Sequence, residues 1–178
     1  MKIVLLTHER ELSRPTNTGC LALTHFPEHC QQVIWSRVNP DPALQQACET
    51  GQALLMFPAK DESNNDTEVL GAGVAATKPT WTTYSELDQI EAVANKQIII
   101  LDATWQEARK MMRQSPYLQQ ADRLALSVVG DSSYQLRRNQ LEGGLCTIEC
   151  VQLLFRQASM LKQAELLEVA FTQFNQRS

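Results

Sequence analysis

Three residues that can do chemistry follow an apolar run over residues 98–101, and they are Asp102, Thr104 and Trp105. A carboxylate can accept a proton or pair with an ammonium group, and an indole can stack on a nucleobase or an adenine ring. Open α/β sheets bind their ligands beyond the carboxyl ends of the strands. If the apolar run is such a strand, these residues mark a binding or catalytic site.

The same residues also have a structural interpretation. Asp102 or Thr104 can cap a helix that begins at Trp105, and Glu107 lies three residues after Thr104, which is the spacing of a capping box. Trp105 can be a core side chain where the strand meets the helix. The pattern favours the cap for Thr104, and it leaves both interpretations open for Asp102 and Trp105.

Strand-like and helix-like segments alternate along the chain. The strands are expected over residues 2–7, 32–35, 53–57, 97–101 and 124–129, and the helices over 18–26, 42–50, 85–95, 105–113, 146–160 and 163–175. Ser115 and Pro116 are expected to end the helix after Trp105. This order predicts an α/β fold with a mostly parallel sheet and helices on both faces. Residues 60–83 are polar and are expected to form a lid or an insertion.

Polar residues are concentrated in the segments that follow the strands. If the strands are parallel, these segments meet at one edge of the sheet. Arg14 and the turn around Asn17 and Thr18 can hold a carboxylate or a phosphate, or they can serve only as a turn with a helix cap. Arg37 can contact a phosphate or be a surface charge. The segments are residues 9–19, 36–37, 57–58, 102–105 and 131–138.

Composition fits a single soluble domain of 178 residues, of which 43% are hydrophobic and whose net charge is -4. The sequence shows no signal peptide and no apolar run near the roughly 20 residues that span a membrane, so we expect a cytoplasmic protein without membrane contact. The acidic balance alone argues against nucleic-acid binding. Residues 104–138 nevertheless contain 6 basic and 3 acidic residues, which form either a local basic face or ordinary solvated charges.

The cysteines are scattered and form no Cys-x-x-Cys pair, so we expect no metal site. A catalytic cysteine would need histidine and acidic partners, for which the 3 histidines offer little support. We therefore expect all 5 to be small buried apolar residues: Cys20, Cys30, Cys48, Cys146 and Cys150.

The segment from Asp102 to Met111 resembles the DTW-domain family, which is named for an Asp-x-Thr-Trp signature. Further stretches agree with the family in order and spacing, and together they cover nearly the whole chain. They are residues 14–19, 35–37, 55–58, 115–118, 134–137 and 143–149.

The resemblance implies a tRNA-uridine aminocarboxypropyltransferase. Such an enzyme moves the 3-amino-3-carboxypropyl group of S-adenosylmethionine to N3 of a uridine in tRNA and releases 5′-methylthioadenosine. It also implies a SPOUT-like α/β domain with the C-terminal trefoil knot of that class. Two other functions are considered: the same chemistry on ribosomal RNA or another acceptor, and a non-catalytic RNA-binding module.

We expect residues 1–178 to form a single DTW domain without the cysteine-rich, zinc-knuckle-like N-terminal segment of many members. RNA docking is then expected on the basic face or on a partner.

The resemblance and the positions of the polar segments assign roles as follows. The expected catalytic residues are Asp102, Thr104 and Trp105. The residues expected to bind S-adenosylmethionine are Phe57, Pro58, Leu101, Asp102, Gly144, Leu145, Cys146 and Thr147. The residues expected to bind RNA are Arg14, Asn17, Thr18, Arg37, Arg109, Lys110, Tyr134, Arg137 and Arg138. No metal is expected.

Overall fold

The computed structural model describes residues 1–57, 81–83, 95–125 and 145–176. Its strands are β1 (Lys2–Thr7), β2 (Cys30–Ile34), β3 (Ala53–Met56), β4 (Trp81–Thr83), β5 (Gln97–Asp102) and β6 (Asp122–Ala125). The helices described are η1 (Glu9–Glu11), α1 (Gly19–His25), α2 (Pro42–Glu49), α4 (Trp105–Gln114), α5 (Pro116–Gln120), α6 (Thr147–Gln157) and α7 (Leu161–Asn175).

The described strands form one parallel sheet in the order β2-β1-β5-β3-β6-β4. The predicted α/β class with a mostly parallel sheet is therefore confirmed. The register places Thr7 at the end of β1 beside both Ile34 and Asp102. The carboxyl ends of β2, β1 and β5 therefore lie side by side, where the sequence predicted a site.

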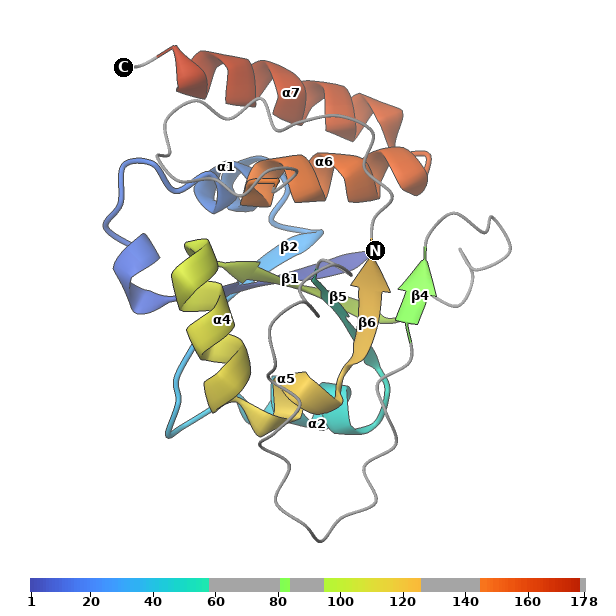
Figure 1. Ribbon diagram of the computed structural model, residues 1–178. Coiled ribbons are helices and arrows are strands. Elements are labelled where there is room, and N and C mark those ends of the chain that lie inside the picture. The colour runs from blue at the N-terminus through green and yellow to red at the C-terminus, as the bar shows by residue number, and fades with distance from the viewer. Residues whose placement is uncertain (58–80, 84–94, 126–144, 177–178) are drawn as a thin grey trace, which may run out of the picture.

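Two apolar cores cover the two faces of the sheet. Side chains alternate along a strand, so Ile3 and Leu5 of β1 pack with α1, α6 and α7, while Val4 and Leu6 pack with α2, α4 and α5. Figure 1 shows the two sets of helices on opposite sides of the sheet. The predicted covering of both faces is confirmed.

Helix starts follow local capping chemistry. Asp41 accepts a hydrogen bond from the backbone N–H of Leu44 at 2.8 Å, and Pro42 occupies the first turn of α2, where its missing N–H costs nothing. α4 ends at Gln114, one residue after the predicted end and just before Ser115-Pro116. Pro116 then starts the short helix α5, which the sequence analysis missed. Proline stops one helix and is equally suited to begin the next.

Two strand predictions need correction. β4 lies inside the polar 60–83 segment, where no strand was expected, and three residues are too few to show a period-2 pattern. β6 begins at Asp122, two residues before the predicted start. The predicted helix over 85–95 falls almost entirely outside the described residues, as do residues 126–129. No helix in the described part of the chain is long and apolar enough to cross a membrane.

The cysteines are mostly buried, as predicted. Cys30, Cys48 and Cys146 are buried and Cys150 is half-buried, whereas Cys20 is exposed on α1, so the prediction is wrong for that residue. Burial raises the pKa of Cys30 and Cys48 to about 12 and raises that of Cys146 as well. A buried thiol with a raised pKa is a poor nucleophile, which favours the predicted structural role for these three cysteines.

Replacing Phe155 tests the core between the sheet and α6. Its ring is fully buried and meets Phe26 edge-on with 5.3 Å between centroids. We expect Phe155→Ala to lower the free energy of unfolding by about 3–5 kcal/mol, through lost burial and the cavity left behind. Urea denaturation measures this. Leu166→Ala on α7, where the side chain is 58% exposed, is the control and should be nearly neutral.

Candidate functional site

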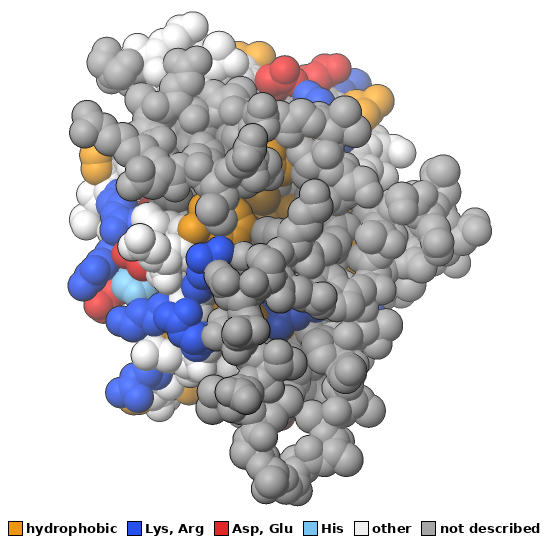
Figure 2. Space-filling model, in the orientation of Figure 1, with side chains coloured by type: hydrophobic (Ala, Val, Ile, Leu, Met, Phe, Trp, Pro, Cys, Tyr) orange, Lys and Arg blue, Asp and Glu red, His pale blue; other side chains and the backbone are white. Residues whose placement is uncertain are grey.

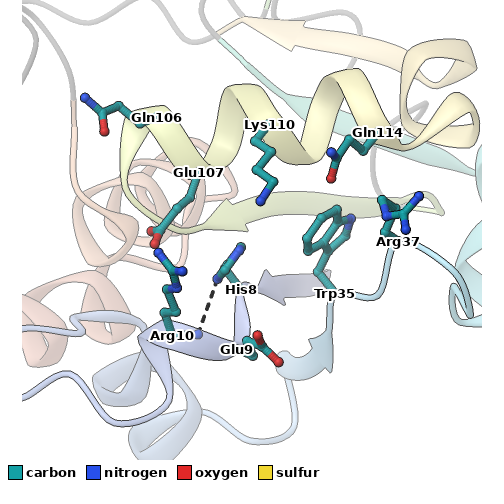
Figure 3. Close-up of a pocket in the computed structure, with 9 residues that line it drawn as sticks. All are labelled: His8, Glu9, Arg10, Trp35, Arg37, Gln106, Glu107, Lys110 and Gln114. Carbon is teal, nitrogen blue, oxygen red and sulfur yellow. Dashed lines mark hydrogen bonds between the residues drawn. The ribbon is translucent and has the colours of Figure 1, made fainter.

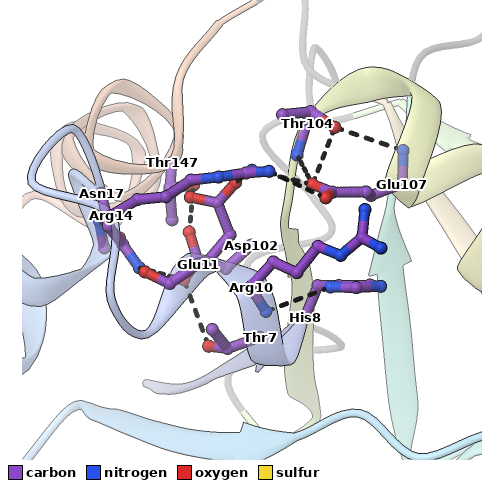
Figure 4. Close-up of polar contacts among 11 residues, drawn as sticks. Thr7, His8, Arg10, Glu11, Arg14, Asn17, Asp102, Thr104, Glu107 and Thr147 are labelled. Carbon is purple, nitrogen blue, oxygen red and sulfur yellow. Dashed lines mark hydrogen bonds and ion pairs between the residues drawn. The ribbon is translucent and has the colours of Figure 1, made fainter.

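The Asp102 carboxylate is buried at the end of β5, where it is 1% exposed and accepts hydrogen bonds from three separate parts of the chain. Thr7 Oγ1 and Asn17 Nδ2 donate to Oδ2 at 3.1 and 3.2 Å, and Thr147 Oγ1 donates to Oδ1 at 2.8 Å (Figure 4). β1, the turn before α1 and the start of α6 therefore converge on one carboxylate.

Local structure holds each donor in place. Asn17 Nδ2 also donates to the carbonyl of Glu11 at 3.1 Å, and its Oδ1 accepts from the backbone N–H of Gly19 at 2.7 Å. The backbone N–H of His8 donates to the Asp102 carbonyl at 3.1 Å. With both oxygens engaged inside the protein, the geometry favours an organising role for Asp102. A direct role with substrate stays a prediction.

A hydrogen bond connects the start of α1 to the start of α6. The Thr18 side chain does not cap its own helix but accepts from the backbone N–H of Ile148 at 3.4 Å. The backbone N–H of Cys146 donates to Glu149 at 2.8 Å. Thr147 and Glu149 are buried, so the first turn of α6 is packed inside the protein and is not exposed to solvent. Asn17 and Thr18 are buried as well, and their predicted RNA contact gains no structural support.

Arg14 is held by two acids. Its guanidinium donates to both carboxylate oxygens of Glu107, at 2.9 and 3.0 Å, and also pairs with Glu11 (Figure 4). These bonds, above all those to Glu107, raise the pKa of Arg14. The sequence analysis assigned Arg14 to RNA, whereas in the structure it ties the turn after η1 to α4. Neither acid was predicted as its partner.

Thr104 caps α4, as the spacing favoured. Its Oγ1 accepts from the Glu107 backbone N–H at 3.3 Å, and its own backbone N–H donates to Glu107 Oε2 at 3.0 Å, which completes the capping box. Its hydroxyl also donates to that oxygen at 2.7 Å. The side chain that was expected to be catalytic is therefore engaged in placing the first turn of α4.

An aromatic cluster lies beyond the ends of β3 and β5. The half-buried Trp105 meets Phe57 edge-on with 6.2 Å between ring centroids. The guanidinium of Arg123 lies 5.9 Å from the centre of the Phe57 ring. Arg123 is only 8% exposed, so it does not belong to the basic face that its charge suggested. Phe57 and Trp105 provide a partly exposed surface of the kind that packs against a planar ring.

The remaining predicted residues divide by location. Arg37 and Lys110 are exposed and line one cleft, and Arg109 is half-buried on α4. Leu101 and Leu145 are half-buried near the sheet edge. Within the described residues, no three His, Cys, Asp or Glu side chains come together as a metal site. The predicted residues outside the described ranges are Pro58, Tyr134, Arg137, Arg138 and Gly144.

Gly19 touches the buried carboxylate, which gives a test of the Asp102 centre. A Cβ at Gly19 would lie 3.0 Å from the Cγ and both oxygens of Asp102. Because those oxygens are held by three donors, we expect Gly19→Ala to lower the free energy of unfolding by about 1–3 kcal/mol in urea denaturation. Thr24→Ala, at an exposed position of the same helix, is the control. Equal stability of the two variants would contradict the conclusion that the three donors hold the Asp102 carboxylate firmly in place.

Glu107 makes stability depend on acid pH. Burial acts to raise its pKa, but hydrogen bonds from Arg14 and Thr104 outweigh burial and lower the pKa to about 2 from 4.5. Ionised Glu107 therefore stabilises the fold above pH 4.5, and this contribution is lost as the pH falls from 4.5 towards 2. Glu107→Gln should destabilise the protein at neutral pH and less at about pH 3.

Urea denaturation at both pH values checks this, with Glu165→Gln at an exposed position of α7 as the control. A difference between wild type and Glu107→Gln that does not change with pH would contradict the assignment.

The DTW domain family model matches residues 1–178. "tRNA-uridine aminocarboxypropyltransferase 2" of Drosophila melanogaster is 26% identical over 152 residues, which are 83% of this chain and 52% of that protein. The chain thus spans about half the length of this curated relative. No solved structure matches the chain significantly. Since the family model covers every residue, the chain belongs to the DTW domain family.

Proposed function

We propose that this protein transfers the 3-amino-3-carboxypropyl group of S-adenosylmethionine to N3 of a uridine in tRNA. The observation that carries the proposal is the Asp102-Ala103-Thr104-Trp105 signature at the carboxyl end of β5, joined through Asp102 to α1 and α6. Membership of the DTW family and the name of the Drosophila relative support it.

The reaction needs little covalent help from the protein. The N3 nitrogen attacks the carbon of the transferred arm that is bonded to the sulfonium. That C–S bond breaks, its electron pair stays on sulfur, and 5′-methylthioadenosine leaves as a neutral thioether. The N3 proton passes to a base or to water. Because the leaving group is already good, most of the rate comes from positioning and electrostatics.

The described residues fit such a donor. Phe57 and Trp105 offer aromatic surface for the adenine or the uracil, and Thr147 and Cys146 lie at the start of α6 beside Asp102. We assign Asp102 as the residue that positions α1 and α6 around the donor, and Thr104 as the cap that places Trp105. Pro58, Leu101, Gly144 and Leu145 complete the proposed donor site.

RNA is the proposed macromolecular substrate, in the cytoplasm. Arg37 and Lys110 are exposed and can meet phosphates, and we propose the same role for Arg109, Tyr134, Arg137 and Arg138 from the family resemblance. Arg14 contributes to RNA binding only indirectly, because Glu11 and Glu107 hold its guanidinium against α4. The SPOUT-like arrangement with a C-terminal knot is part of the same proposal. The parallel sheet with helices on both faces supports its α/β class, and the knot is proposed from the family resemblance alone.

Nucleoside mass spectrometry tests the reaction. Unmodified tRNA is incubated with the protein and S-adenosylmethionine, and we expect aminocarboxypropyl-uridine to form. Trp105→Ala should reduce the product about tenfold, since base stacking is worth about 1–3 kcal/mol. Trp105→Phe keeps a ring and should recover part of the loss. Leu166→Ala, exposed on α7, controls for general damage.

Calorimetry with S-adenosylmethionine separates the alternatives. If the protein binds S-adenosylmethionine and modifies ribosomal RNA but not tRNA, the acceptor is ribosomal RNA and the tRNA assignment is wrong. Absence of both donor binding and product would leave an RNA-binding module and overturn the proposed activity.

A further inference from the structure

A second feature of the sheet edge is a cleft of about 350 Å³ between η1, the end of β2 and α4. Figure 3 shows Lys110 projecting from α4 towards His8 and Trp35, with Arg37 beside the indole. His8 and Trp35 are the residues that follow β1 and β2. The sequence analysis gave none of His8, Arg10 and Trp35 a role in the site, although Arg10 lies in the polar segment 9–19 and Trp35 in the family-matching stretch 35–37.

The cleft is more positive than the protein around it. Arg10, Arg37 and Lys110 are exposed on its walls, and Glu9 is the one exposed acid among its lining residues. Its other acid, Glu107, is already paired with Arg14. Within the described ranges, no carboxylate lies within ion-pair distance of these three cations. Figure 2 shows Lys and Arg side chains gathered around a histidine over η1 and α4.

The aromatic part of the cleft is held rigidly. Trp35 stacks on His8 with 5.5 Å between centroids and 22° between planes, and its Nε1 donates to Ser115 Oγ at 2.9 Å. His8 Nδ1 accepts from the backbone N–H of Arg10 at 3.3 Å. Because Nδ1 is the acceptor in this bond, Nε2 is the ring nitrogen that remains to donate a hydrogen bond at the cleft.

This cleft is separate from the proposed donor site. Trp105 and Gln114 are nine residues apart on α4, which is two and a half turns at about 3.6 residues per turn, so they face opposite ways. Glu107, Lys110 and Gln114 share the cleft side. Trp105 instead packs against Phe57. One helix thus has the signature indole on one side and a basic, aromatic cleft on the other.

Given the proposed function, we propose that the cleft binds one single-stranded nucleotide that flanks the modified uridine. Its phosphate lies among Arg10, Arg37 and Lys110, and its base packs on Trp35. A cationic rim beside a preorganised aromatic side chain is the combination that binds single-stranded nucleic acid. The cleft thereby holds the RNA strand while the neighbouring uridine reaches the Trp105 side of α4.

The test is a titration with a short labelled single-stranded RNA, followed by fluorescence anisotropy. We expect Arg37→Ala and Lys110→Ala each to weaken binding about tenfold and to flatten the dependence of log affinity on log salt by about 0.7. Lys162→Ala, which removes an exposed lysine from α7, is the matched control and should bind within about twofold of wild type. Trp35→Phe should weaken binding less than Trp35→Ala.

Equal affinity of Arg37→Ala, Lys110→Ala and Lys162→Ala would overturn the proposal. Competition with uridine 5′-monophosphate and with inorganic phosphate separates a nucleotide site from a plain anion site. We expect the nucleotide to compete far better, and equal competition by phosphate would overturn the nucleotide assignment.

Steady-state kinetics separates this inference from the activity on which it rests. Arg37→Ala and Lys110→Ala should raise KM for tRNA and leave donor binding and kcat unchanged. If both variants form product with an unchanged KM for tRNA, the nucleotide-binding role of the cleft is wrong, while the proposed activity is kept. If wild type forms no product while both variants still lose RNA affinity, the proposed activity fails and the cleft assignment is supported.

Discussion

The buried carboxylate of Asp102 is the constraint on which the rest of the site depends. A charge removed from water is costly unless hydrogen bonds satisfy it, so the fold must bring donors to it. Thr7, Asn17 and Thr147 supply them from β1, the turn before α1 and the start of α6. A shift of α6 would remove the Thr147 donor from Oδ1, and a shift of the turn before α1 would leave Oδ2 with Thr7 alone, so the carboxylate favours one position for both helices at the sheet edge.

A second network adds α4 to this arrangement. Arg14 lies in the same turn as Asn17. Its guanidinium makes a bidentate contact with Glu107 in the first turn of α4. Glu107 is also the acid of the capping box with Thr104. One carboxylate thus starts the helix and ties it to a segment 93 residues earlier in the chain. The position of Trp105, the first residue of α4, follows from that double role.

The signature residues are mostly not exposed because they position other parts of the site. Asp102 and Thr104 are engaged within the protein, and Trp105 remains partly open beside Phe57. On the opposite side of α4, Lys110 faces a cleft with a rigid aromatic pair. α4 therefore separates two surfaces of different chemistry, an aromatic one beyond the ends of β3 and β5 and a cationic one near η1. The proposed reaction joins a small donor to a charged polymer, and it would use both surfaces.

The sequence by itself determined the α/β class with a mostly parallel sheet, most of the helices and the Thr104 cap. These depend on period, on proline and on contacts between residues three or four apart. Only the tertiary structure decided that Arg14 pairs with Glu107, that Arg123 is buried and that His8 stacks on Trp35. The physical reason is that a long side chain takes its partner from whatever lies across from it in space, and that neighbour is set by strand register and helix packing.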